Sequence, residues 1–214
     1  IAFIGSTGSG KSTLINLIPR FYDVTEGSIR IDGIDVRKFN LKALRKKIGF
    51  IRQKNLLFTG TIKSNIKFGK PHATHDEVEH SAKIAQAYDF ITNKEKGFDE
   101  PISEGGSNVS GGQKQRLSIA RALVRKPEIY IFDDSFSALD FKTDAILRKA
   151  LKKETTDAIV LIVAQRIGSI MDADKIIVLD EGKVVGVGKH KELLKTCNVY
   201  HEIALSQLTE EELA

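Results

Sequence analysis

The chain has 214 residues, of which 41% are hydrophobic and 29% are charged, and its formal net charge is +5. This size is sufficient to bury a full core, and no apolar stretch reaches the roughly 20 residues that are needed to cross a bilayer. One cysteine excludes an internal disulfide, and the basic runs lack aromatic neighbours that could stack on bases, so the composition argues against a disulfide scaffold and against nucleic-acid binding.

The first glycine-rich segment is the most specific feature of the sequence. Residues 5–12 read GSTGSGKS; they follow an apolar run, 1–4, that predicts a buried strand, and precede residues 13–18, which predict a helix. In such a unit the glycines let backbone N–H groups converge on an anion at the positive end of the helix. Lys11 can then reach terminal phosphates, and the Ser12 hydroxyl can ligate Mg²⁺. The alternative is a glycine-rich turn with a surface lysine.

The next part of the chain changes from strands to helices. We expect a hairpin around Asp32 and Gly33, a short helix from Leu41 and a strand over 48–52. The segment 61–126 is then predicted to be helical, with 75–93 as its longest helix before position 110.

A second glycine segment, Ser110-Gly111-Gly112-Gln113, opens another helical pattern. Apolar residues recur at helical spacing after it and mark a buried face: Leu117, Ala120, Leu123 and Val124. Ser110 and Gln113 fit a capping box, and capping alone is the simpler interpretation. However, two glycines inside a helix start cost about 1 kcal/mol each against alanine. Bare N–H groups close to a phosphate explain that cost better.

The last third alternates predicted strands, 129–133, 159–163 and 175–179, with helices, as parallel α/β sheets do. Residues 180–182, Asp-Glu-Gly, indicate a hairpin turn rather than a second carboxylate site. The histidines at 72, 75, 80, 190 and 201 lack zinc-ligand spacing, so we expect them to be solvated. We expect a packing or surface role for Cys197, and a solvated helix end for the acidic tail from Glu210 to Glu212.

With both glycine segments in view, the chain resembles the nucleotide-binding domain of ATP-binding cassette (ABC) transporters along nearly its whole length. The segment resembling the Walker A loop comprises Gly5, Ser6, Thr7, Gly8, Ser9, Gly10, Lys11, Ser12 and Thr13. Further segments resemble the Q-loop glutamine (Gln53), the signature (Ser110, Gly111, Gly112 and Gln113, after Val109), Walker B (129–133), the D-loop (Ser137, Ala138, Leu139 and Asp140) and the switch position (Gln165).

The resemblance implies an α/β fold: a P-loop ATPase core with a mainly parallel sheet, a small antiparallel β part and an inserted helical lobe. Residues 1–60 and 127–214 would form the core, and residues 61–126 the lobe with the signature. It also implies that ATP and Mg²⁺ are cofactors, with Ser12, Gln53 and Asp133 at the metal. The chain starts inside the Walker A strand, so we expect an N-terminally truncated domain whose adenine-stacking residue cannot be identified.

In this family two domains sandwich two ATP molecules head to tail, and each signature faces the ATP of the partner. The segment from Leu57 to Ile62 and the residues Glu104, Gly105 and Gly106 resemble exporters rather than importers. The resemblance therefore implies fused transmembrane helices outside these residues and a place at the cytoplasmic face of the membrane. A soluble ABC ATPase acting on ribosomes or chromosomes is the alternative, which would require a second cassette or a coiled-coil insertion.

Two residues depart from the family pattern. Asp134 stands where a glutamate normally polarises the attacking water, and Gln165 stands where the switch histidine is usual. Aspartate is one methylene shorter, and a displacement of about 1 Å in a catalytic group can cost on the order of a hundredfold in rate. Glutamine cannot take a proton or donate a charge-assisted hydrogen bond. These changes favour the weakly hydrolysing half of a heterodimeric exporter, with a non-identical partner domain; a fully active homodimer is the alternative.

Overall fold

The computed structural model describes residues 1–209, so the predicted acidic helix end at 210–212 lies outside the described residues. The chain divides into two compact units. Unit 1 contains residues 1–48, 131–134 and the described residues from 160 onward, and unit 2 contains residues 49–130 and 135–159. The predicted division into an ATPase core and a helical lobe at 60/61 and 126/127 stays a prediction.

The largest sheet contains β1 (Ala2–Ile4), β4 (Ile48–Ile51), β7 (Ile129–Asp133), β8 (Ile159–Val163), β9 (Ile176–Asp180) and β10 (Lys183–Gly188). Its strand order is β10-β9-β1-β8-β7-β4. β1 pairs in parallel with β8 on one side and with β9 on the other, whereas β10 is antiparallel to β9. The predicted α/β class with a mainly parallel sheet is therefore confirmed. The bounds of β8 agree with the strand predicted over 159–163, and those of β9 differ by one residue from the strand predicted over 175–179.

Unit 1 also contains helices and a small hairpin. These elements are α1 (Lys11–Asn16), β2 (Arg30–Ile31), β3 (Ile34–Asp35), the 3₁₀ turn η1 (Val36–Lys38), α2 (Leu41–Lys46), the 3₁₀ turn η4 (Ile167–Ser169), α8 (His190–Thr196) and α9 (Asn198–Leu205). β2 and β3 form one antiparallel hairpin, and β9 and β10 form a second. The two central residues of each turn have positive φ. The values are 53° and 77° at residues 32–33, and 44° and 78° at residues 181–182. Such turns match the twist of the strands, so both predicted hairpins are confirmed.

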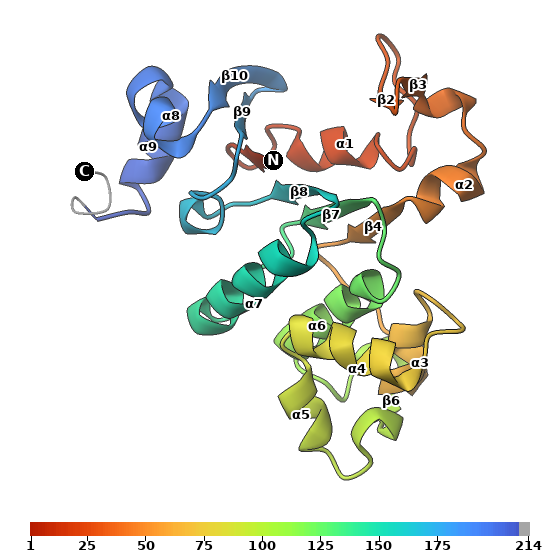
Figure 1. The fold of residues 1–214 in the computed structure, drawn as a ribbon. Helices are drawn as coiled ribbons and strands as arrows, with labels where there is room; N and C mark the ends of the chain where they lie inside the picture. The colour runs from red at the N-terminus through yellow and green to blue at the C-terminus, as the bar shows by residue number, and fades with distance from the viewer. Residues whose placement is uncertain (210–214) are drawn as a thin grey trace. The chain divides into compact units, whose positions relative to one another are not determined.

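The core of unit 1 lies between the sheet and the C-terminal helices. Ile4 of β1, Val178 of β9 and Tyr200 of α9 are all fully buried in one apolar cluster. In Figure 1, α8 and α9 lie together beside β9 and β10, and α8 contacts β10 while α9 contacts β9. Cys197 belongs to the same buried cluster, which agrees with a packing role.

Unit 2 is mainly helical. Its elements are β5 (Gly60–Thr61), α3 (Ile62–Lys67), α4 (His75–Ile84), α5 (Tyr88–Thr92), the 3₁₀ turn η2 (Gly97–Asp99), β6 (Pro101–Ile102), the 3₁₀ turn η3 (Glu104–Gly106), α6 (Gly111–Leu123) and α7 (Phe141–Glu154). α6 packs against both α3 and α4 (Figure 1). The expected buried face of α6 is confirmed, because all four apolar residues assigned to it are at most 4% exposed.

Several sequence expectations were wrong in detail. The single helix predicted over 75–93 is two helices, because Gln86 between them adopts φ = 56°. That value lies in the left-handed region, which a continuing right-handed helix does not permit. The first helix runs over 11–16 instead of 13–18, and the segment expected to be helical contains the short antiparallel pair β5–β6. This strand pair joins residues 40 and 42 positions apart in the sequence, and the local periodicity of side chains carries no information on such distant pairing.

His190 is the one histidine that contradicts the expected solvated role. Its side chain is only 8% exposed, and its Nδ1 atom lies 2.7 Å from the hydroxyl oxygen of Tyr200. Burial lowers the pKa of His190, with Lys191 acting in the same direction and Asp172 opposing it. The His190 and Tyr200 rings also lie with their centres 5.8 Å apart, so His190 packs against α9.

Candidate functional site

The loop between β1 and α1 has a backbone that only glycine can adopt at key positions. Gly5 has φ = 155°, and a Cβ atom there would lie 1.9 Å from the carbonyl oxygen of Leu179 on β9. Gly8 and Gly10 have φ of 85° and 94°, in the left-handed region. The glycines therefore allow the loop to turn back over the end of β1.

The side chain of Lys11 fills the middle of this loop. Its Nζ atom donates hydrogen bonds to the carbonyl oxygens of Gly5 at 2.8 Å and Ser6 at 2.7 Å, and to Oγ of Ser9 at 3.2 Å. Burial lowers the pKa of Lys11, while the nearby carboxylates of Asp134 and Asp133 raise it. The loop thus holds a partly desolvated positive charge next to its backbone.

The same loop offers hydrogen-bond donors to an anion. Within residues 1–209, the backbone N–H groups of Gly8, Gly10 and Ser12 have no protein acceptor. The first turn of α1 contributes to this set, because the first N–H groups of a helix lack intrahelical partners. Converging N–H groups beside a lysine are the donors that phosphate oxygens require. The residues present therefore fit a phosphate chain.

A hydroxyl and a carboxylate meet beside this loop. Ser12 Oγ donates a hydrogen bond to Oδ1 of Asp133 at 2.9 Å, although the two residues are 121 positions apart in the sequence. Asp133 ends β7, and Ser12 lies in the first turn of α1. Mg²⁺ prefers such oxygen ligands and is commonly held by one carboxylate together with phosphate oxygens. The pair therefore fits a magnesium ion bound next to a phosphate.

The two residues that depart from the family pattern contact each other directly. Gln165 Nε2 donates a hydrogen bond to Oδ2 of Asp134 at 2.8 Å. Asp134 is 8% exposed and has φ = 46°, and its backbone N–H donates to the carbonyl oxygen of Val163 at 3.0 Å. Gln165 follows that valine by two residues, after the end of β8. Unit 1 thus brings Lys11 close to the carboxylates of Asp133 and Asp134, and Asp134 is in turn hydrogen-bonded to Gln165.

The segments that resemble the signature (110–113) and the D-loop (137–140) both lie in unit 2, close to each other. A Cβ atom on Gly112 would lie 3.3 Å from the carbonyl oxygen of Ala138 and 3.7 Å from the side chain of Leu139. A larger residue at 112 would therefore crowd the D-loop. On Gly111 a Cβ atom would meet nothing within 4 Å, so packing within the chain does not require that glycine.

Each of these two segments contains the N-cap residue of a helix, Ser110 for α6 and Asp140 for α7. The predicted capping box is confirmed, because Gln113 N–H donates to Ser110 Oγ at 3.2 Å and Ser110 N–H donates to Gln113 Oε1 at 3.1 Å. Asp140 caps α7 by accepting hydrogen bonds from Thr143 N at 2.9 Å and Thr143 Oγ1 at 2.7 Å. Capping explains Ser110 and Gln113, but it leaves Gly111 without a structural reason. Gln53 is an exposed residue of unit 2, two positions after β4.

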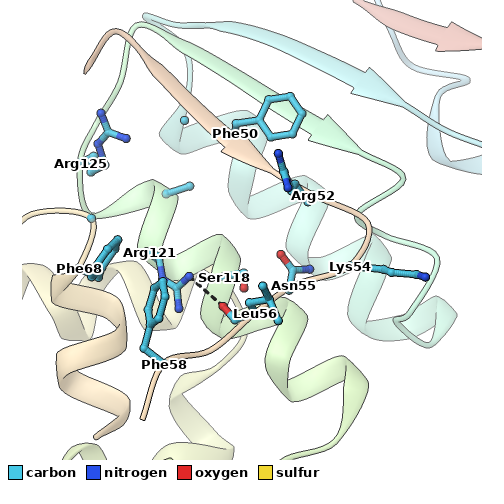
Figure 2. A pocket seen from close by; sticks show the side chains of 13 residues that line it. Phe50, Arg52, Lys54, Asn55, Leu56, Phe58, Phe68, Ser118, Arg121 and Arg125 are labelled. Carbon is cyan, nitrogen blue, oxygen red and sulfur yellow. Dashed lines mark hydrogen bonds between the residues drawn. The ribbon is translucent and has the colours of Figure 1, made fainter. Parts of the chain in front are cut away.

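Unit 2 also contains a cavity of about 310 Å³ that sequence reasoning did not identify. Figure 2 shows Arg121 in its wall together with Phe58, Phe68 and Leu56. The Arg121 guanidinium lies 5.2 Å and 5.9 Å from the centres of the Phe58 and Phe68 rings and donates to the Leu56 carbonyl oxygen at 3.0 Å. No local motif marks this cavity, because its lining comes from segments far apart in the sequence.

A second residue that sequence reasoning missed contacts the switch region. Gln207, two residues after α9, hydrogen-bonds the backbone of Gln165 and Ile167. A lone glutamine near a helix end carries no sequence signal, so only the folded structure identifies it. None of the helices within residues 1–209 is both long and apolar enough to span a membrane.

Comparisons with known proteins identify the family and the fold of this chain. Over 203 residues, the chain is 48% identical to multidrug export ATP-binding/permease proteins of Staphylococcus aureus strains NCTC 8325 and COL, covering 95% of this chain and 35% of each relative. It thus spans about a third of the length of these curated relatives. The solved structure of a bacterial Atm1-family ABC exporter with ATP bound matches 98% of the chain and 37% of its own chain, with a TM-score of 0.95 and 39% identity.

The structural match confirms the predicted P-loop ABC ATPase fold. A family model described as ABC transporter matches residues 1–137, which include the glycine loop, the Walker B strand and the signature. The chain therefore belongs to the ABC transporter family.

Proposed function

We propose that this chain is the ATP-binding domain of an ABC exporter and that it couples ATP binding and hydrolysis to transport across a membrane. The Lys11–Ser12–Asp133 arrangement beside the glycine loop is the observation that carries this proposal. The names of the similar proteins, multidrug export proteins and an exporter with ATP bound, support export over a role on ribosomes or chromosomes. Membrane segments outside this chain would place the domain at the cytoplasmic face.

In this proposal the glycine loop and Lys11 hold the β- and γ-phosphates of ATP. The ammonium of Lys11 exchanges its bonds to the Gly5 and Ser6 carbonyl oxygens for bonds to phosphate oxygens, which carry a full negative charge. Ser12 and Asp133 would hold Mg²⁺, which would supply positive charge to the β- and γ-phosphate oxygens. Thr13 and the remaining loop residues complete the phosphate cradle.

We further propose that ATP at this chain's own site is hydrolysed slowly. The Asp134 side chain is one methylene shorter than glutamate, and one of its carboxylate oxygens already accepts a hydrogen bond from the Gln165 amide. A carboxylate engaged in this way is poorly placed to polarise water. The amide can also donate only a neutral hydrogen bond to a γ-phosphate.

The signature residues Ser110, Gly111 and Gly112, followed by Gln113, would serve the ATP of a second domain. The free space around Gly111 supports this proposal, since a close phosphate gives a reason for a glycine that packing does not require. A chain with a weak site of its own and a complete signature fits a non-identical partner. The alternative, a fully active homodimer, predicts equal losses of ATP turnover from Ser110→Arg and from Asp134→Ala.

The helical lobe would contact the membrane domain of the exporter, as the family resemblance implies. The cavity around Arg121 supports this part of the proposal. Phe68 of the lobe is 65% exposed on it, and Leu56 and Phe58, which directly precede the lobe in the sequence, are 70% and 46% exposed. Exposed apolar groups around a hollow are typical of a docking surface.

The metal assignment is tested by calorimetry of ATP binding, with and without Mg²⁺, in the complete transporter. Asp133→Asn should leave binding of ATP alone nearly unchanged and remove most of the gain in affinity that Mg²⁺ gives. Asp157→Asn, which changes an exposed carboxylate of unit 2, is the matched control and should behave as the wild type. A full Mg²⁺ effect in Asp133→Asn would show that this carboxylate does not hold the metal.

A further inference from the structure

The C-terminal part of unit 1 contacts the switch loop, which we define as residues 164–169 between β8 and β9. The side chain of Gln207 makes both contacts. Its Nε2 donates to the carbonyl oxygen of Gln165 at 2.8 Å, and its Oε1 accepts from the backbone N–H of Ile167 at 2.8 Å. One amide therefore bridges two backbone groups that flank a single residue of the loop.

The loop needs these contacts because its own sequence does not provide them. Ile167 is the first residue of the turn η4, and the residue before it, Arg166, gives no side-chain cap. The first N–H groups of such a turn lack partners within it, so Gln207 Oε1 supplies the missing acceptor. A side-chain amide has both a donor and an acceptor, and the two backbone partners are of opposite type, so only one orientation of the amide satisfies both.

The position of Gln207 is itself fixed by the core. Tyr200 and Ala204 of α9 are fully buried, and Leu208, next to Gln207, packs against the same apolar cluster. That cluster includes Ile4, at the end of the strand that leads into the glycine loop. The Gln207 amide thus connects the switch loop to the apolar cluster of unit 1 that also contains the strand before the glycine loop.

The hydrogen bonds form a short series that ends at the Asp134 carboxylate. Gln207 holds the backbone of Gln165, and the Gln165 side chain holds Asp134. We propose that Gln207 is a positioning residue, which keeps the switch loop in the conformation that places Gln165 on Asp134 and next to bound ATP. This inference rests on the proposed function for its link to ATP, whereas the hold on the loop itself does not depend on it.

The test uses the complete transporter with its partner domain and three variants of this chain. Gln207→Ala removes both hydrogen bonds. Gln207→Glu keeps an acceptor for Ile167 N–H but places a negative charge against the carbonyl oxygen of Gln165. Ser206→Ala is the matched control, because the Ser206 hydroxyl donates only to the Ile203 carbonyl oxygen within the same helix end. Amide hydrogen exchange of the switch loop and the dissociation rate of ATP from this site are measured for each.

We expect exchange at Ile167 N–H to become at least about fivefold faster in Gln207→Ala, as the loss of a hydrogen bond of ordinary strength implies. Exchange should stay near the wild-type rate in Gln207→Glu and Ser206→Ala. ATP should dissociate faster in both Gln207 variants and not in the control. The midpoint of thermal unfolding should change little in any of them, since Gln207 is an exposed residue.

Two outcomes overturn the inference. Unchanged exchange at Ile167 in Gln207→Ala would show that the amide does not hold the loop. Faster exchange with an unchanged rate of ATP dissociation would show that the contact is structural only. The proposed function fails by a different result, namely normal ATP affinity after loss of the Lys11 ammonium, so the two failures are distinguishable.

Discussion

The amide of Gln165 donates a hydrogen bond to the carboxylate of Asp134, with 2.8 Å between Nε2 and Oδ2. The two residues are 31 positions apart and are the two that depart from the family pattern. Their contact means that a change at one alters the surroundings of the other. Groups that act as a unit give non-additive effects when they are changed singly, and this leads to the first prediction.

The double variant Asp134→Glu with Gln165→His should raise ATP hydrolysis at this site by at least about tenfold, whereas each single change should do little. The longer carboxylate reaches further toward the attacking water, and a histidine can carry a proton or a charge. We expect less than the 10² to 10⁴ typical of a positioned acid or base, because in the proposed function the partner's signature also contributes to this site. The assay is single-turnover hydrolysis with the partner's catalytic glutamate changed to glutamine.

Ser206→Ala, added to the same background, is the control for the double variant. A double variant as slow as the wild type would place the weakness elsewhere, most directly in the partner's signature. A full gain from either single change would contradict the idea that the two residues act as a unit.

Lys11→Ala should abolish tight ATP binding. The variant removes the ammonium that donates to the loop carbonyl oxygens at 2.7 and 2.8 Å and that we assign to the phosphates. Isothermal calorimetry on the complete transporter measures the affinity at this site, and Lys38→Ala, an exposed lysine of η1, controls for the loss of one positive charge. Unchanged affinity in Lys11→Ala would make the assignment of the phosphate site wrong.

Ser110→Arg should stop ATP turnover by the assembled transporter, whereas Asp134→Ala should reduce it far less. The arginine would block the N-terminus of α6, which we assign to the partner's ATP, while Asp134 serves a site that we propose to be slow. Steady-state ATPase activity of the paired domains measures both variants. Equal losses from the two variants would favour two equivalent sites and hence a homodimer.

Arg121→Lys should lower the thermal stability of the domain. The guanidinium donates to the Asn65 carbonyl oxygen, to Asn65 Oδ1 and to the Leu56 carbonyl oxygen, and an ammonium cannot reach all three. Each acceptor left unsatisfied costs about 1–3 kcal/mol, and a domain of this size loses roughly 2–4 °C per kcal/mol. Calorimetry should therefore show a fall of at least about 2 °C, and Arg30→Lys, at an exposed site on β2, should change the midpoint little.

His190 should make the domain less stable as the pH falls. Burial lowers the pKa of this imidazole below its ordinary 6.5, so between the two pKa values the unfolded chain binds a proton that the folded chain does not. Stability therefore rises with pH in that window, and the loss begins as the pH falls through about 6.5. Thermal unfolding measured from pH 7.5 to pH 5 should show a shallower acid decrease in His190→Gln than in the wild type.

The exposed His201 is the matched position for this measurement. His201→Gln should keep the acid decrease of the wild type. If both variants had the same pH dependence as the unmodified chain, the buried imidazole would not be the group responsible.

Features set by neighbouring residues could be predicted from the sequence. The glycine loop, the capping box at Ser110 and both hairpin turns depend on backbone angles that particular residue types allow, so they are encoded within a few positions. The buried face of α6 likewise follows from a spacing of three and four residues. The alternation of strands and helices was sufficient to indicate the parallel α/β class.

Features that depend on partners distant in the sequence could not be predicted in the same way. The break at Gln86 is a left-handed backbone angle at a residue that usually continues a helix, and the burial of His190 depends on Tyr200 from the following helix. The sequence by itself indicated the family and the glycine loop to which we assign phosphate binding, because both are local patterns of residue type. Only the tertiary structure decided that Gln165 holds Asp134 and that Gln207 holds Gln165, because these hydrogen bonds join positions 31 and 42 residues apart.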